Sequence, residues 1–171
     1  TLYDVFCYDS GGVPTYELLA WTNDTTRATA LTLQDGIRVK TGAVTRRYLG
    51  SVRTTAVAGQ TEDSIKKRYL FNAQNRGWRP MRRQETTATW TYTTATTRQA
   101  NANTANQVEC VVGSPDALLD LCLIGISSNS TGGILTQVTI GEDSTSAFST
   151  DSVFFAVQAG AGAGINQVLH A

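Results

Sequence analysis

The chain has few of the residues on which catalysis and metal binding usually depend. It contains one histidine, His170, and three cysteines, Cys7, Cys110 and Cys122, in 171 residues. A Ser-His-Asp or Cys-His mechanism would rest on a histidine next to the last position, where we expect the chain to fray. The cysteines are too widely spaced for a metal-ligand pattern or a dense disulfide framework. We therefore predict no enzymatic activity, no cofactor and no metal.

Hydrophobic runs long enough to cross a membrane are also missing. No run reaches the roughly 18 apolar residues of a spanning helix, and no stretch resembles a signal peptide. The chain starts at Thr1 rather than Met, as expected of a processed product or a fragment. Charged residues make up only 16%, which argues against disorder driven by charge repulsion. These features predict an ordered protein that does not interact with membranes.

Two short motifs lack the context that their chemistry requires. Gly160–Gly164 alternates glycine with alanine, but the spacing is not GxGxxG, and the seven residues that follow are too few for a dinucleotide-binding unit. This motif predicts a flexible exit from a strand or a close-packing seam. Glu142 and Asp143 predict a solvated turn, because a calcium site needs about six to eight oxygen ligands. No pair of carboxylates for glycoside cleavage stands out, since such a pair is defined in space and not in sequence.

The composition favours β-structure. Threonine occurs 26 times, and β-branched side chains suit the pleated surface of a sheet better than a helix. Leu31–Leu33 and Ile37–Lys40 alternate in polarity on either side of Asp35 and Gly36. Alternation across an Asp-Gly pair is the strongest short sequence signal for a β-hairpin.

A longer strand is predicted over Arg46–Arg53, with Tyr48 and Val52 on one face and Gly50 as a bulge or point of close approach. The other predicted strands are 2–8, 16–21, 68–72, 85–97, 108–112, 118–126, 134–140 and 153–157, and a helical turn is predicted over 62–67. About ten short strands separated by turns predict an all-β fold, an antiparallel β-sandwich of jelly-roll type with little helix. We expect one domain over 1–171, with 158–171 extended or incomplete.

Charge is unevenly distributed although the net charge is zero. Thirteen of the fourteen basic residues lie between Arg27 and Arg83, and no lysine or arginine follows Arg98. Three interpretations are open. The basic and acidic regions neutralise each other within one fold, they meet across subunits of a homo-oligomer, or the basic region binds nucleic acid. The last is the least favoured, and we do not expect a nucleic-acid partner.

One segment combines arginines with an aromatic side chain and is the candidate interface or ligand-binding site. Its residues are Arg76, Trp78, Arg79, Arg82 and Arg83. Interleaved basic and aromatic side chains are able to hold a single nucleic-acid strand by stacking and phosphate contact. They are equally able to hold an anionic glycan, or to pair with acids of a neighbouring subunit. Pro80 confines the segment to an edge, a bulge or a loop.

Several runs resemble a domain found towards the C-termini of virion proteins of tailed bacteriophages. The most specific run is WTNDTTRATALTLQDG, and the others are LYDVFCYD, TRRYLGSVRTT, GQTEDSIKKRYLFNAQNR and TWTYTTATTRQANANTANQVE. The resemblance covers about 2–143 and supplies no catalytic residues. Gly77–Met81 and the three cysteines depart from the pattern.

The resemblance implies a structural virion protein, located in the virion, that forms part of a fibre or appendage. Phage appendages are commonly trimers, so a homotrimer is expected, with other virion proteins and host surface glycan or protein as further partners. A head fibre or capsid decoration protein is the first alternative. A module that depolymerises host glycan is the alternative from a different functional class.

Overall fold

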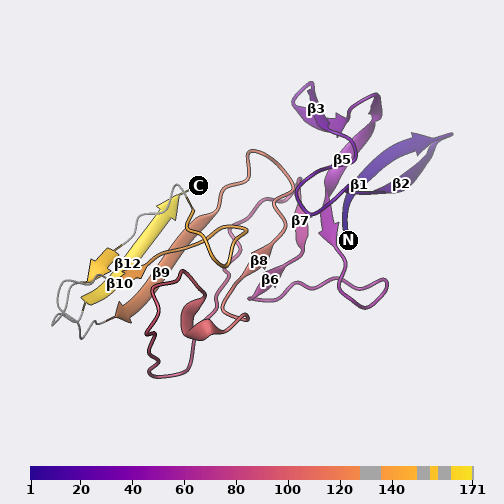
Figure 1. The fold of residues 1–171 in the computed structure, drawn as a ribbon. Helices are drawn as coiled ribbons and strands as arrows, with labels where there is room; N and C mark the ends of the chain where they lie inside the picture. The colour runs from indigo at the N-terminus through magenta and orange to yellow at the C-terminus, as the bar shows by residue number, and fades with distance from the viewer. Residues whose placement is uncertain (128–135, 150–154, 158–162, 171) are drawn as a thin grey trace. The chain divides into compact units, whose positions relative to one another are not determined.

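The computed structural model describes residues 1–127, 136–149, 155–157 and 163–170. Contacts divide the chain into two compact units. Unit 1 comprises 1–84 and 107–117, and unit 2 comprises 85–106 and 118–171 (Figure 1). Each unit is described by itself below. The expectation of one domain over 1–171 stays a prediction.

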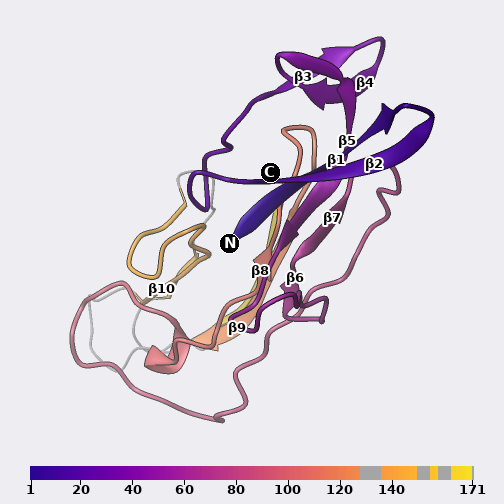
Figure 2. The same ribbon diagram turned by 90° about the vertical axis from the view of Figure 1, so that its right-hand side faces the viewer.

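The largest sheet lies in unit 1 and contains six strands. In chain order they are β1 (Leu2–Ser10), β2 (Val13–Ala20), β3 (Leu31–Gln34), β4 (Ile37–Lys40), β5 (Ala43–Arg53) and β7 (Leu70–Asn72). The order across the sheet is β2-β1-β5-β4-β3, and β7 pairs with β5. Every pairing in this sheet is antiparallel. Figure 2 shows β1, β2, β5 and β7 running beside one another.

Local turn chemistry forms two hairpins of this sheet. Asp35 and Gly36 join β3 to β4 with φ angles of 50° and 78°. Positive φ at both central residues is the requirement of a type I′ turn, whose twist matches that of the strands. Gly11 and Gly12 join β1 to β2 in the same way, with φ angles of 65° and 87°. The hairpin predicted at Asp35 and Gly36 is confirmed, and the strands predicted over 2–8 and 16–21 pair as a second hairpin.

The remaining strands form short ladders. In unit 1, β6 (Lys67–Arg68) pairs in parallel with β8 (Glu109–Cys110). In unit 2, β9 (Asp120–Ser127) pairs with β12 (Ala163–His170), and β10 (Thr136–Val138) pairs with β11 (Phe155–Val157), both antiparallel. A 3₁₀ turn, η1 (Ala100–Ala102), is the only helix of the described residues. The fold class is therefore all-β and mainly antiparallel, as predicted, and consistent with a sandwich. The jelly-roll connectivity stays a prediction.

The end of the chain contains a strand that the sequence did not indicate. Ala163–His170 forms β12, and His170 lies opposite Asp120 in its ladder with β9. Part of the segment expected to be extended or incomplete, and part of the Gly160–Gly164 motif, lies outside the described residues. Within the described part, the expectation that His170 frays is wrong, because eight consecutive residues of β12 pair with β9.

A β-bulge in β5 reverses one predicted face. Val5 of β1 pairs with Gly50, whereas the next residue, Phe6, pairs with Tyr48. The additional residue in β5 shifts the alternation of side chains by one position. Tyr48 and Val52 therefore lie on opposite faces, and the prediction that they share one is wrong.

Gly50 is also a point of close approach, as predicted. A Cβ atom at this position would lie 2.1 Å from the carbonyl oxygen of Phe71 in β7. The absence of a side chain therefore allows β7 to pair with β5 at this point.

Two other predictions of secondary structure are wrong. The helical turn expected over 62–67 is a tight hairpin-like loop, in which the amide of Ser64 donates to Lys67 and that of Lys67 donates to Ser64. The Ser64 hydroxyl also accepts a hydrogen bond from the Lys67 amide, which stabilises the loop against a helix.

The strand expected over 85–97 is irregular. Its backbone groups bind to side chains instead of to a neighbouring strand. The Glu85 carboxylate accepts from the Thr87 amide at 2.9 Å, and the Arg98 guanidinium donates to the Thr94 carbonyl at 2.9 Å. Trp90 and Tyr92, expected on a half-buried face, are 41% and 40% exposed. Alternation alone predicted a strand here, but a strand needs a partner for its backbone.

Candidate functional site

Three of the most deeply buried side chains of unit 1 form a polar network on the face of the sheet that also buries Phe6. Asp4, Tyr48 and Ser51 are 1%, 0% and 1% exposed. The Ser51 hydroxyl donates to Asp4 Oδ1 at 2.7 Å, and the Tyr48 hydroxyl lies 2.6 Å from Ser51 Oγ and donates to the Gly113 carbonyl at 2.6 Å. Burial raises the pKa of the Tyr48 hydroxyl above its usual value.

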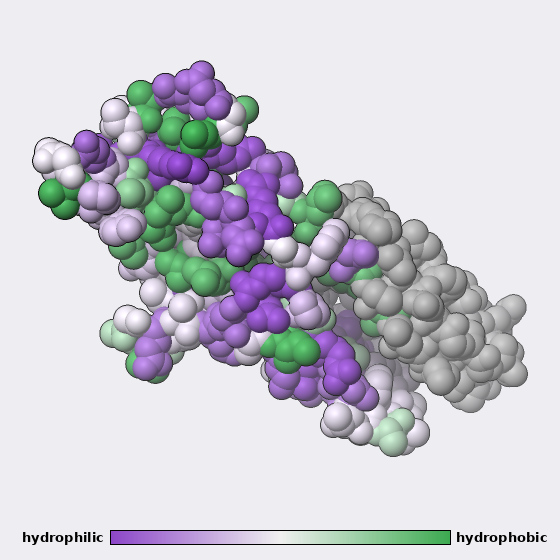
Figure 3. All heavy atoms as spheres, turned by 180° about the vertical axis from the view of Figure 1, so that it is seen from behind, coloured by the Kyte–Doolittle hydropathy of each residue, from purple (hydrophilic) through white to green (hydrophobic). Residues whose placement is uncertain are grey.

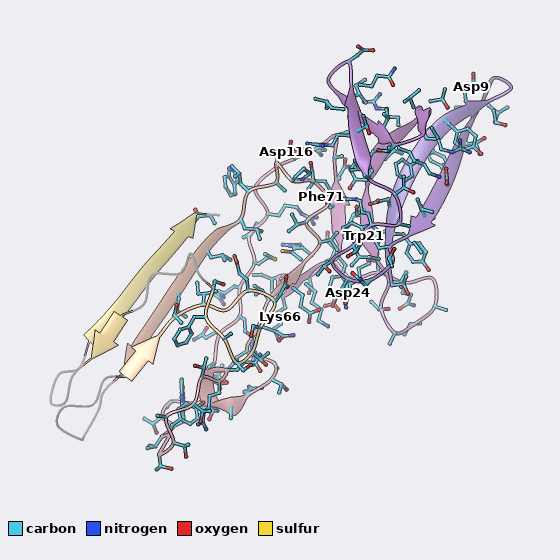
Figure 4. All side chains as sticks on the ribbon, turned by 45° about the horizontal axis from the view of Figure 1, so that its top comes forward. Asp9, Trp21, Asp24, Lys66, Phe71 and Asp116 are labelled. Carbon is cyan, nitrogen blue, oxygen red and sulfur yellow. The ribbon has the colours of Figure 1, made fainter. Side chains whose placement is uncertain are left out.

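Arg27 completes this network from the loop that follows β2. Its Nε donates to Asp4 Oδ2 at 2.9 Å, and its Nη2 donates to the Gly113 carbonyl at 2.6 Å. The guanidinium lies 4.3 Å from the centre of the Trp21 ring, which Figure 4 labels. The network thus ties the loop after β2 and the segment around Gly113 to the sheet.

The polar network has the character of a scaffold. A serine nucleophile needs an adjacent base, but the Ser51 hydroxyl donates to a carboxylate that is already paired with Arg27. Two surface hollows of unit 1 are lined by other residues and not by members of the network. The described residues also contain no cluster of three or more His, Cys, Asp or Glu side chains able to hold a metal ion.

The opposite face of the same strands is apolar. Residues paired directly across antiparallel strands lie on the same face. On this basis the apolar face consists of Tyr16, Leu18 and Ala20 of β2, Tyr3, Val5 and Cys7 of β1, Gly50 and Val52 of β5, and Leu70 of β7, with Asp9, Pro14, Arg47 and Asn72 at its margins. Tyr16 is 63% exposed, Leu18 is 60% exposed and Leu70 is 45% exposed. The space-filling view in Figure 3 shows apolar patches of this kind among polar residues over unit 1.

The structure separates the arginines of the predicted site. Arg76 Nη1 donates to Asp116 Oδ2 at 2.5 Å, and its guanidinium lies 5.7 Å from the centre of the Phe71 ring. Both partners are labelled in Figure 4. The Arg79 guanidinium instead binds Asp63 and donates to the Leu70 carbonyl at 3.2 Å. The two arginines are therefore held by different carboxylates and do not form one clamp.

The other predicted site residues differ in their exposure. The Arg82 amide donates to the Ile65 carbonyl at 2.8 Å, and the side chain is exposed. Arg83 is half-buried. Trp78 is 77% exposed, the largest exposure among the large apolar side chains of the described residues. The segment carries no strand, in agreement with the prediction from Pro80.

A surface hollow lies between β7 and the segment that carries Gly77 and Arg79, and Trp78 itself is not among its lining residues. The hollow has a volume of about 340 Å³ and is lined by Asp63, Leu70, Asn72, Asn75, Gly77 and Arg79. Arg79 was predicted as a site residue, whereas Asp63, Leu70, Asn72 and Asn75 were not. The Asn72-Ala73-Gln74-Asn75 spacing is a local signal for a side-chain turn, but nothing in the sequence connects Asp63 to this segment.

The hydrogen bonds to Asn72 and the two ion pairs of Asp63 determine which polar groups the hollow offers. Asn72 Oδ1 accepts from the amides of Gln74 at 2.9 Å and Asn75 at 3.1 Å. The Arg79 guanidinium, and then that of Arg68, hold the pKa of the Asp63 carboxyl below its usual value. Asp63 is therefore ionised at neutral pH and its charge is compensated.

No protein-family model, curated protein or solved structure matches the chain. Among the described residues, no helix has the length and apolar character needed to span a membrane.

Proposed function

We propose that the chain is a non-enzymatic structural protein of a tailed-phage virion, an appendage domain that assembles with copies of itself and attaches to the host surface. The apolar face is the observation that carries the self-assembly. Exposed apolar patches larger than a few hundred Å² are rare on monomers and mark interaction surfaces. The resemblance of the sequence to phage virion proteins supports the location in the virion and the trimeric state.

A second copy of the chain suits this face for two reasons. The paired positions of the face carry one acid, Asp9 at the turn end of β1, and one base, Arg47 opposite Cys7, both at its margin. Identical faces therefore meet without strong like-charge repulsion. The strand β2 also lies at the edge of the sheet, where its outer backbone groups are open to pairing with another chain.

The closed polar network supports the non-enzymatic part of the proposal. Its serine, tyrosine, aspartate and arginine side chains bind one another and the Gly113 carbonyl. They hold the fold together, and the exposed surfaces remain for binding.

Light scattering on the purified chain tests the assembly. We expect a homo-oligomer, with Leu18→Lys shifting the mass to that of a monomer because a charge would enter the apolar face. Leu33→Lys is the matched control, since Leu33 is 62% exposed but lies on β3, the other end of the strand order. A monomer at all concentrations, or equal effects of the two variants, would contradict the proposal.

Labelling phage particles with an antibody to this chain tests the location. We expect label on a tail appendage. Label on the head shell would contradict the appendage role and favour the capsid decoration protein, and release of oligosaccharides from host polysaccharide would contradict the non-enzymatic role.

A further inference from the structure

We propose that copies of the chain join head to tail, with Tyr16 of β2 on one copy seated in a surface hollow beside β4 on the next. This hollow belongs to unit 1 and has a volume of about 200 Å³. Its lining residues are Gln34, Asp35, Ile37, Val39, Val44 and Arg47. The inference rests on the proposed self-assembly and specifies which parts of two copies meet.

The hollow continues the apolar face beyond β5. Arg47 pairs with Cys7 of β1 on one side and with Val39 of β4 on the other, and residues paired directly across antiparallel strands share a face. Ile37 lies two residues before Val39 in β4, so it belongs to the same face. The apolar face therefore extends from Tyr16 in β2 to the hollow at β4.

The size of the hollow indicates a side chain as its occupant. Small-molecule sites occupy roughly 300–1,000 Å³, and this hollow is smaller. Val39 is buried, but Ile37 and Val44 are 40% and 52% exposed, so apolar surface remains to be covered. An aromatic side chain that fills a pocket of the partner is a common anchor of a protein–protein contact.

Tyr16 is the side chain of the apolar face that best suits this hollow. It is 63% exposed and belongs to β2, which β1 and β5 separate from β4 in the sheet. Tyr16 therefore does not fill the hollow of its own chain, but it is available to another copy. A tyrosine combines a large apolar ring with a polar tip, and the hollow has apolar and polar lining residues.

The polar lining of the hollow matches the tyrosine hydroxyl. In the described part of the chain, the side chains of Gln34 and Asp35 have no hydrogen-bond partner, and neither has the Tyr16 hydroxyl. A tyrosine hydroxyl donates and accepts, so it is able to bind the carboxylate or the amide. Asp35 and Arg47 have opposite charges, so the hollow has no net charge that would require an ionised side chain from the partner.

The contact is heterologous, because Tyr16 and the hollow are different parts of the surface. Copies joined by a heterologous contact form a closed ring when the rotation between them closes. A two-fold contact instead joins the same part of both copies and ends at a dimer. The proposed trimer needs a heterologous contact, since a threefold ring contains no two-fold axis.

Light scattering on single variants tests both sides of the contact. We expect Tyr16→Lys and Ile37→Lys each to weaken self-association about tenfold or more, because each places a charge at the centre of the contact. Leu33→Lys is the matched control for Ile37→Lys. Leu33 is 62% exposed and pairs with Arg38, whereas Ile37 pairs with Gln34, so Leu33 lies on the opposite face of the same hairpin. It should associate like the unchanged chain.

Mixing the two variants distinguishes a head-to-tail contact from a two-fold one. The Tyr16→Lys chain keeps an intact hollow and the Ile37→Lys chain keeps an intact Tyr16. An equimolar mixture should therefore form dimers at a concentration where each variant alone is monomeric. A mixture that stays monomeric would overturn the inference, because a head-to-tail contact must be restored in it.

Photo-crosslinking tests the contact without an introduced charge. A photoreactive phenylalanine analogue replaces Tyr16, and isotopically labelled chains identify crosslinks between copies. We expect crosslinks to peptides of a second copy that contain Ile37 or Val44. Crosslinks only to β2 of the second copy, or none between copies, would overturn the inference.

The inference and the proposed assembly fail in different ways. An oligomer whose mass is the same in Ile37→Lys as in the unchanged chain would remove the head-to-tail contact and leave the assembly in place. An unchanged chain that is monomeric at all concentrations would remove the assembly itself.

Discussion

On one face of the sheet in unit 1, the polar side chains of Asp4 and Ser51 are buried at 1% exposure each; on the other face, the apolar side chains of Tyr16 and Leu18 are 63% and 60% exposed. Leu2 and Phe6 share the buried face at 6% and 0% exposure, so the unusual features are the polar side chains within this core and the exposed apolar side chains opposite it. The two faces therefore perform different tasks, one within the chain and the other, as we propose, between chains.

The buried face shows how a small sheet fixes its covering segments. An apolar interior would permit several packing arrangements, whereas Asp4 and Arg27 satisfy each other only in one. Removing one partner from a buried pair leaves an uncompensated charge, so the network specifies which loop covers the sheet. The apolar face has no such network, and covering it with any complementary surface lowers the free energy.

Among the changes that distinguish the two faces, Asp4→Ala should have the largest effect on stability. We expect a loss of roughly 3 kcal/mol or more in the free energy of unfolding, because Arg27 and Ser51 lose their buried acceptor. Chemical denaturation measures it. Asp24→Ala is the control, since it removes a pair with Arg53 in which Asp24 is 64% exposed, and it should cost less than about 1 kcal/mol. Equal losses of unfolding free energy in the two variants would contradict the structural role of the buried network.

A smaller loss is expected from Gly50→Ala on the apolar face. The new Cβ would lie 2.1 Å from the carbonyl oxygen of Phe71, so β7 must move away from β5. We expect roughly 1–3 kcal/mol of destabilisation, as for an overpacked core, measured by thermal or chemical unfolding. Gly77→Ala has open space around the new Cβ and should leave the stability nearly unchanged. A neutral Gly50→Ala would mean that β7 is not held against β5.

The hairpins of this sheet were predictable because their signals are local. The Asp35-Gly36 and Gly11-Gly12 pairs adopt positive φ within two residues, and the strands on either side follow from them. The bulge next to Gly50 was anticipated, but its consequence was not, because a register shift changes the face of every later residue. The threonine-rich segment 85–97 does alternate in polarity, but the strand predicted from this alternation is absent, since no neighbouring strand pairs with the segment in the described structure.

The candidate site was predictable only in part. The exposed Trp78 and the flanking arginines were evident from composition, whereas their partners come from distant parts of the chain. Asp63 and Asp116 lie on opposite sides of the segment in sequence, and each binds one arginine of the segment and one arginine from elsewhere in unit 1. The buried network has the same origin, since it joins Asp4, Arg27 and Ser51 from three separate segments. Long-range polar pairing has no periodic signal in a single sequence.

The smallest expected effect is on the pH dependence of stability, and it comes from Glu17 at the margin of the polar face. The hydrogen bond from Lys40 lowers the pKa of the Glu17 carboxyl below its usual value of 4.5, burial opposes this less strongly, and the hydrogen bond from Arg46 lowers the pKa further. The stabilising effect of Glu17 is therefore full above about pH 4.5 and is lost as the pH falls through the lower folded-state value. We expect Glu17→Gln to flatten the rise in urea midpoint between acid and neutral pH. An unchanged slope would contradict this account of Glu17.

Reactivity of Cys7 tests most directly whether the apolar face is the one that meets another copy. Cys7 pairs with Tyr16 on that face and is half-buried in the single chain. Alkylation followed by peptide mass mapping should show slow modification of Cys7 in the unchanged chain and fast modification in Leu18→Lys, with Leu33→Lys like the unchanged chain. Equally fast modification of Cys7 in all three would contradict the account, because the face would then be open in every form.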